Sequence, residues 1–174
     1  MSRRKQADIP LIPDGVLLNG QGSCEVSDVR LGLKPMSYNG CGVIALYNAM
    51  VLSGRRADLR LIHSAVGRNA LTLFGLLGVS PFRYAWAAAK AGIRVHSIRR
   101  YHEFAFRLKG HIGIVCCWTG KPFLSTMHFM AVDGRNTERL DVCNRYNDLK
   151  STSAVKDLTA LCSKRQYVMG YILE

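Results

Sequence analysis

Residues 37–42 read Ser37-Tyr38-Asn39-Gly40-Cys41-Gly42. Apolar residues recur with a helical period from residue 43 onward, and Gly54 ends the pattern, which predicts a helix over about residues 41–53. Asn39 is a favourable N-cap residue, so Cys41 is expected in the first helical turn. The free N–H groups and partial positive charge of that turn lower the pKa of a thiol and can bind an oxyanion. The stretch therefore predicts a cysteine nucleophile with half of an oxyanion hole built around it.

The patterns along the chain change from helical to strand-like. Helices are predicted at about residues 57–66, 69–77 and 81–92, the last with Ser80 as its cap, and at 101–108 and 154–162. Strands are predicted at about residues 93–98, 111–118, 127–132, 139–143 and 167–173. Asp133-Gly134 is a strong turn signal between the third and fourth of these strands. The order predicts an α+β fold with an N-terminal helical half and a C-terminal, largely antiparallel sheet.

Length and composition predict one globular domain. The chain has 174 residues, of which 48% are hydrophobic. Residues 1–14 begin with basic residues and are expected to form a flexible N-terminal arm, so the domain is predicted at residues 15–174. No apolar run reaches the roughly 18 residues that span a bilayer, and the N-terminus lacks the apolar core of a secretory signal. We therefore expect a cytoplasmic protein without a transmembrane segment.

The cysteines and the charge limit the cofactors and partners. None of the six cysteines forms a C-x-x-C pair or a zinc-like spacing with histidine, so no metal and no cofactor are expected, and the thiols are expected to be reduced. The net charge of +12 favours an anionic partner, although a solvated basic surface accounts for it equally well. The basic residues are scattered in short groups rather than gathered on one helix, which makes nucleic acid an unlikely partner and leaves an acidic peptide as a possible one.

His128 is the best-placed candidate for a base that would serve the thiol. It stands at the start of the strand predicted at residues 127–132 and follows a loop, so it is held rigidly and still faces a cleft. The next strand ends at Asn144, and a hairpin brings that end back beside the start of the first strand. Asn144, or as a second choice Asp141, is therefore expected to orient the imidazole of His128. The other four histidines are expected to be structural.

This combination resembles the papain-like cysteine peptidases, and most closely the bacterial double-glycine leader peptidases and their stand-alone relatives. The resemblance spans roughly residues 35–148 and rests on blocks at residues 39–42, 77–80, 91–93, 108–115 and 128–132. It implies a papain-like fold and hydrolysis of an amide bond in a peptide or leader segment. It also implies a catalytic triad of Cys41, His128 and Asn144.

The sequence departs from this family at the oxyanion hole. Relatives place a glutamine six positions before the nucleophile, where this chain has Pro35. Asn39 or Ser37 is expected to supply the missing donor. Cys24, which follows a Gln-Gly-Ser run, is a second and weaker candidate for the nucleophile because a poor helix start follows it. Two alternatives stay open: a weakly active or inactive binding module on the same fold, and a thiol acyltransferase or amidase.

Overall fold

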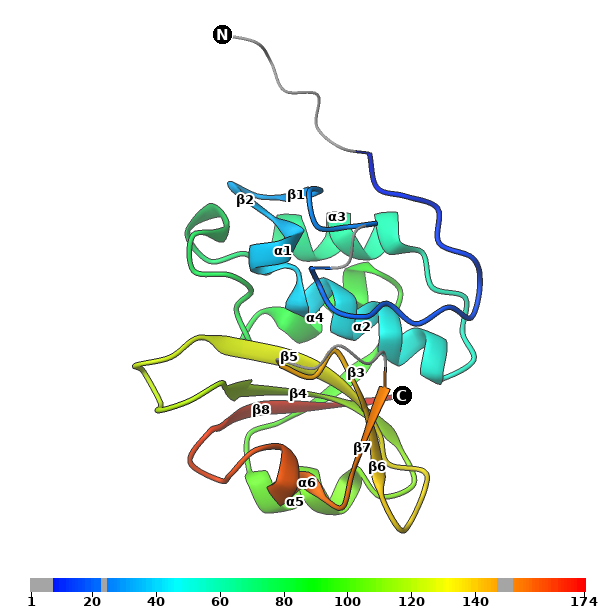
Figure 1. Ribbon diagram of the computed structural model, residues 1–174, viewed down its shortest axis with the longest axis vertical. Coiled ribbons are helices and arrows are strands. Elements are labelled where there is room, and N and C mark those ends of the chain that lie inside the picture. The colour runs from blue at the N-terminus through cyan, green and yellow to red at the C-terminus, as the bar shows by residue number, and fades with distance from the viewer. Residues whose placement is uncertain (1–7, 23–24, 147–151) are drawn as a thin grey trace, which may run out of the picture.

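A computed structural model describes residues 8–22, 25–146 and 152–174. Figure 1 shows three layers, in which a sheet lies between a large helical layer and a small one. The sheet has six strands in the order β3-β8-β4-β5-β6-β7, and every pairing between neighbours is antiparallel. The strands are β3 (Val95–Ile98), β4 (Ile112–Trp118), β5 (Met127–Asp133), β6 (Leu140–Cys143), β7 (Thr152–Val155) and β8 (Tyr167–Leu173).

The helices cover both faces of the sheet. The larger layer contains α1 (Met36–Asn39), α2 (Cys41–Leu52), α3 (Leu59–Asn69) and α4 (Tyr84–Lys90). The smaller layer contains α5 (Tyr101–Arg107) and α6 (Leu158–Leu161), and a two-stranded ribbon of β1 (Arg30–Leu31) and β2 (Lys34–Pro35) flanks the larger one. The predicted α+β class, with helices in the first half and an antiparallel sheet in the second, is confirmed.

Each face of the sheet has its own apolar core. On the α2 side the rings of Tyr84, Phe129 and Tyr171 pack together, with centroids 4.6 Å and 4.9 Å from Tyr84 to the other two. On the α5 side Phe104 lies directly against Gly170, where an added Cβ would come within 2.2 Å of the ring. The core on the α2 side holds α2 against β4 and β5, and Cys41 at the start of α2 lies beside the backbone of Phe129 near the start of β5.

Three predicted helices differ from the structure. Residues 69–77 contain only the short 3₁₀ turn η1 (Leu73–Gly75), because Leu73 and Phe74 adopt positive φ angles of 46° and 55° that no right-handed helix permits. The helix predicted at residues 81–92 is limited to α4, and Ser80 does not cap it. The first part of the helix predicted at 154–162 belongs to β7, and the Asp157 side chain caps the remaining turn by accepting hydrogen bonds from two backbone N–H groups.

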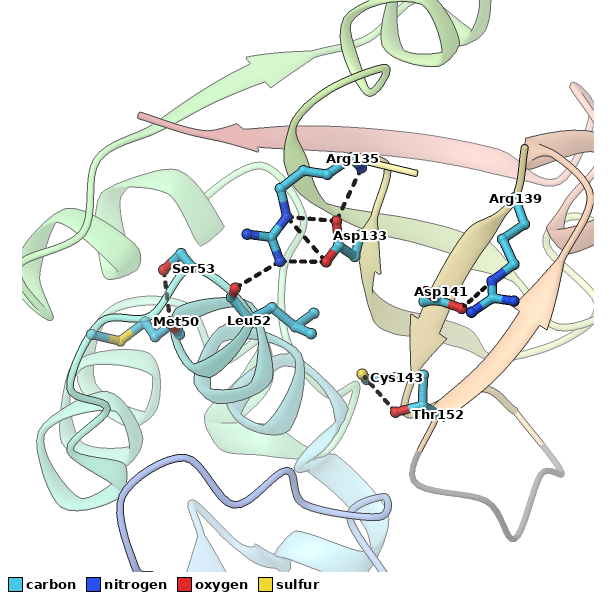
Figure 2. Close-up of polar contacts among 9 residues, drawn as sticks. All are labelled: Met50, Leu52, Ser53, Asp133, Arg135, Arg139, Asp141, Cys143 and Thr152. Atoms are coloured by element: carbon cyan, nitrogen blue, oxygen red, sulfur yellow. Dashed lines mark hydrogen bonds and ion pairs between the residues drawn. The ribbon is translucent and has the colours of Figure 1, made fainter. Parts of the chain in front are cut away.

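Hydrogen bonds join α2 to Leu18 in the N-terminal part of the chain and to Arg135 just after β5. Asn48, fully buried in α2, accepts a hydrogen bond from Leu18 N (2.9 Å) and donates one to Leu18 O (3.0 Å). Figure 2 shows Arg135 pairing with Asp133 at the end of β5 and donating to the carbonyl of Leu52 at the end of α2. Together these contacts join the second half of α2 to residue 18 and to the end of β5.

Candidate active site

A cavity of about 1180 Å³ opens between the helical layer and the part of the sheet where β4 ends and β5 begins. Cys41, His128 and Asn144 all line it, together with residues 10–13, 16–22 and 76–79. We call this space the Cys41 cavity. The packing of α2 on β5, together with the end of β6, therefore brings residues up to 103 positions apart in the sequence to one cavity.

Cys41 is the first residue of α2, as predicted, but the helix does not begin with a free end. The short helix α1 ends at Asn39, and Gly40 continues in a helical conformation into α2. The Asn39 side chain makes no capping hydrogen bond, so its predicted role as N-cap is wrong. The chain can turn this tightly because Gly40 has no side chain, and a Cβ there would lie 2.5 Å from the carbonyl oxygen of Met36.

The thiol of Cys41 is buried, and burial controls its protonation. Desolvation raises the pKa of Cys41 to about 11, although hydrogen bonds from the backbone N–H groups of Phe129, Gly42 and Cys41 itself act in the opposite direction. The prediction that the helix start would lower this pKa is therefore wrong for the free protein, because the loss of water around the sulfur outweighs the backbone donors. The N–H of Phe129 places the sulfur directly beside the backbone that follows His128.

His128 lies near the start of β5 and is buried. Its Nε2 lies 2.6 Å from the main-chain oxygen of Asn144. A carbonyl oxygen can only accept, so Nε2 carries the proton, and the second ring nitrogen, Nδ1, is left as an acceptor. Burial lowers the pKa of His128, and the hydrogen bond to Asn144 offsets part of this effect. The imidazole is therefore neutral at pH 7 and able to take up a proton.

Asn144 follows β6 and contacts both of the other residues. Its side-chain Nδ2 donates to Phe129 O (3.0 Å) and to Cys41 O (3.5 Å). The structure thus brings Asn144 to His128, but the contact with the ring is made by the main-chain oxygen, whereas sequence reasoning had assumed the side chain.

Asp141, the second choice for that position, lies elsewhere. It pairs in register with Asp133, at the opposite end of β5 from His128, and its carboxylate forms an ion pair with Arg139 (3.2 Å; Figure 2). It is not among the residues that line the Cys41 cavity. Asp141 is not beside His128 because it lies three residues before Asn144, where the register of β6 places it opposite Asp133.

The two predicted oxyanion donors differ in availability. Asn39 is buried, and its Nδ2 donates to Gly75 O (2.6 Å) and Leu31 O (3.2 Å), so both amide hydrogens have backbone partners. Asn39 therefore supports the loop before residue 79 rather than an oxyanion. Ser37 is exposed at the rim of the Cys41 cavity. Cys24 lies outside the described residues.

Gln21 is a cavity residue that sequence reasoning did not connect with Cys41. Its Nε2 lies 3.0 Å from Ser37 O and 3.3 Å from Tyr38 O, in the short helix that precedes Cys41. Pro35, in the position where relatives have glutamine, is not among the residues that line the cavity. The only sequence signal was the Gln-Gly-Ser run itself, since the separation of 20 residues hides the contact.

Within residues 8–22, 25–146 and 152–174, no group of three or more His, Cys, Asp or Glu side chains could hold a metal ion. No helix among these residues is both long and apolar enough to cross a bilayer.

Comparison with known proteins supports the fold. No protein-family model and no curated protein sequence matches this chain. Among solved structures, the peptidase domain of Streptococcus ComA, a bifunctional ABC transporter involved in quorum sensing, is similar with a TM-score of 0.53 and 16% identity, over 76% of this chain and 89% of that one.

A second similar structure is a double glycine motif protease from an AMS/PCAT transporter, solved in complex with its leader peptide. It has a TM-score of 0.50 and 15% identity, over 76% of this chain and 82% of that one. Both neighbours are papain-like cysteine peptidase domains. The chain therefore has the papain-like fold of double-glycine peptidase domains, as the sequence predicted.

Proposed function

We propose that this protein is a cysteine peptidase that hydrolyses an amide bond in a peptide. The observation that carries the proposal is the meeting of Cys41, at the start of α2, with His128, at the start of β5, in one cavity. The Cys41 sulfur contacts the N–H of Phe129, the residue that follows His128, and the His128 ring is held in a defined tautomer. Likeness to two peptidase domains supports the same reaction class.

The proposed reaction starts from a protonated thiol at Cys41 and a neutral imidazole at His128 that carries its proton on Nε2. His128 Nδ1 accepts the thiol proton as the Cys41 sulfur attacks the substrate carbonyl. The proton then passes to the leaving amine, and a thioester with Cys41 remains. Water attacks the thioester with His128 again accepting a proton, which releases the acid and restores the thiol. Because burial raises the pKa of Cys41 to about 11, the transfer accompanies substrate binding rather than preceding it.

The oxyanion needs donors near the start of α2. The backbone N–H of Cys41 already points at the sulfur and supplies one of them. Gln21 is a side-chain amide that lines the same cavity, and its Nε2 would have to exchange a contact with Ser37 O or Tyr38 O for the oxyanion. Ser37 is the second candidate, through its hydroxyl group at the cavity rim.

The proposed substrate is a peptide or leader segment. One solved neighbour is described in complex with a leader peptide, and residues 10–13, 16–22 and 76–79 all line the Cys41 cavity. The net charge of +12 favours an acidic peptide. Free thiols at the five described cysteines fit the proposal of a cytoplasmic location.

The test is cleavage of a peptide panel by the wild-type protein, Cys41→Ala and His128→Ala, followed by mass spectrometry. Cleavage by the wild type that both variants lose supports the proposal. Cleavage retained by Cys41→Ala refutes it. Rising salt should weaken cleavage of acidic peptides more than that of neutral ones, and an equal response to salt would remove the charge argument.

A second candidate is a binding module with little or no catalysis. The buried thiol favours it, since a pKa of about 11 leaves very little thiolate at neutral pH. In that case Cys41→Ala would bind peptide as tightly as the wild type, and the wild type would leave the peptide intact. Acyl transfer on the same site is distinguished by adding an amine acceptor such as hydroxylamine, which would divert the product from the acid to the hydroxamate.

A further inference from the structure

The backbone at Asn144 has a conformation that few residues adopt. Its φ of 62° lies in the left-handed region, and it is one of four non-glycine residues with positive φ in the described part of the chain. β6 ends one residue earlier, at Cys143. The left-handed turn therefore takes the chain out of the sheet, and it directs the Asn144 carbonyl at His128, with the oxygen 2.6 Å from Nε2.

The side chain of Asn144 is engaged elsewhere. Nδ2 donates to Phe129 O at 3.0 Å and reaches Cys41 O at 3.5 Å. One of these carbonyls belongs to the strand that carries the imidazole, and the other belongs to the nucleophile itself. The side chain is thus a link between α2 and β5, and it is buried.

We propose that Asn144 orients His128 through its main-chain carbonyl, while its amide side chain fastens the nucleophile helix to the histidine strand. The catalytic meaning of this arrangement rests on the proposed function. Position 144 therefore requires a residue that tolerates the left-handed region and donates hydrogen bonds to two carbonyls. A side-chain acceptor for the imidazole is not required there.

A main-chain carbonyl has consequences that a carboxylate would not have. It accepts only, so it selects the tautomer with hydrogen on Nε2 and leaves Nδ1 without a proton, available as a base. It carries no charge, so it stabilises an imidazolium ion less than a carboxylate does. The lowered pKa of His128 agrees with a neutral partner in a buried site.

The first test reads the tautomer of His128 by nitrogen NMR on histidine-labelled protein, with His128→Gln to assign the signal. The wild type should show a proton on Nε2 and a strongly downfield Nε2–H resonance. A proton on Nδ1 instead would overturn the proposal. This measurement does not depend on cleavage, so it stands or fails separately from the proposed function.

The second test compares three variants, each first shown to fold by its thermal transition. Asn144→Gly keeps the carbonyl and adopts the left-handed turn freely, but it loses the side-chain link, so we expect a reduced kcat with the Nε2–H signal retained. Asn144→Ala also loses the link and in addition disfavours the turn, so its kcat should be about tenfold lower than that of Asn144→Gly. Asn144→Asp places acceptors against two carbonyls, and its kcat should be at least tenfold below that of Asn144→Gly.

The reverse order of the variants would overturn the proposal. If the side chain orients the ring, Asn144→Asp retains kcat and raises the pKa of His128 in the pH profile, and Asn144→Gly loses both kcat and the Nε2–H signal. Equal losses in all three variants, with the Nε2–H signal unchanged in each, would also refute a role for the carbonyl geometry.

Discussion

Replacing Asn48 by alanine should loosen the N-terminal wall of the Cys41 cavity and destabilise the protein. Asn48 is fully buried and makes two hydrogen bonds with the backbone of Leu18, at 2.9 Å and 3.0 Å. Each bond contributes about 1 kcal/mol, and each buried backbone group left without a partner costs about 1–3 kcal/mol, reduced where water can enter. We expect the free energy of unfolding to fall by about 2–4 kcal/mol.

Urea denaturation at constant m value measures this change, and hydrogen exchange at the Leu18 amide locates it. Asn69→Ala is the matched control, since its Nδ2 makes a local bond to Ala65 O within α3, and it should cost less than about 1 kcal/mol. Because residues 16–21 line the cavity, Asn48→Ala should also raise KM for a peptide more than it lowers kcat. An unfolding free energy within about 0.5 kcal/mol of wild type, with the Leu18 amide still protected, would refute the reasoning.

Three further predictions concern protonation and packing. Alkylation of Cys41 by iodoacetamide, followed by mass spectrometry against Cys41→Ser, should rise about tenfold per pH unit and reach no plateau below about pH 11; a plateau near pH 8 would show that burial does not control this thiol. Burial lowers the pKa of His128 below its unfolded-state value of 6.5, so as pH falls the unfolded chain binds a proton more readily than the folded chain, and stability should be lost. His128→Gln should flatten this pH dependence in urea midpoints measured from pH 4.5 to 8, and an unchanged slope would contradict the prediction. Gly170→Ala would bring a Cβ within 2.2 Å of the Phe104 ring and should cost about 3 kcal/mol, of which Phe104→Leu should restore part; additive losses in the double variant would argue against that contact.

The elements that sequence reasoning located well are those with a strong local pattern. α2 and the strands β4 and β5 follow from the periodicity of their own apolar residues, and their bounds agree with the prediction to within a residue or two. The failures occurred where local pattern and backbone conformation disagree. Leu73 and Phe74 look helical by composition, but their positive φ angles are held by contacts such as the bond from Leu33 N to Phe74 O.

The candidate site also contains residues that a local sequence pattern indicates and residues that only folding brings together. Cys41 and His128 were found because each stands at the start of a well-marked element. Gln21 was not connected with them because its partners, the carbonyls of residues 37 and 38, lie far along the chain. Asp141 was a reasonable second choice only while the register of β6 was unknown.

The amino-acid sequence alone determined α2, β4 and β5, with Cys41 at the start of the helix and His128 near the start of a strand, because these features depend on neighbours within a few residues. Only the tertiary structure decided that the thiol is protonated and that the carbonyl of Asn144, rather than its side chain, meets the imidazole. Desolvation and hydrogen-bond partners at this site come from segments that folding brings together from distant parts of the chain, so no local pattern contains them.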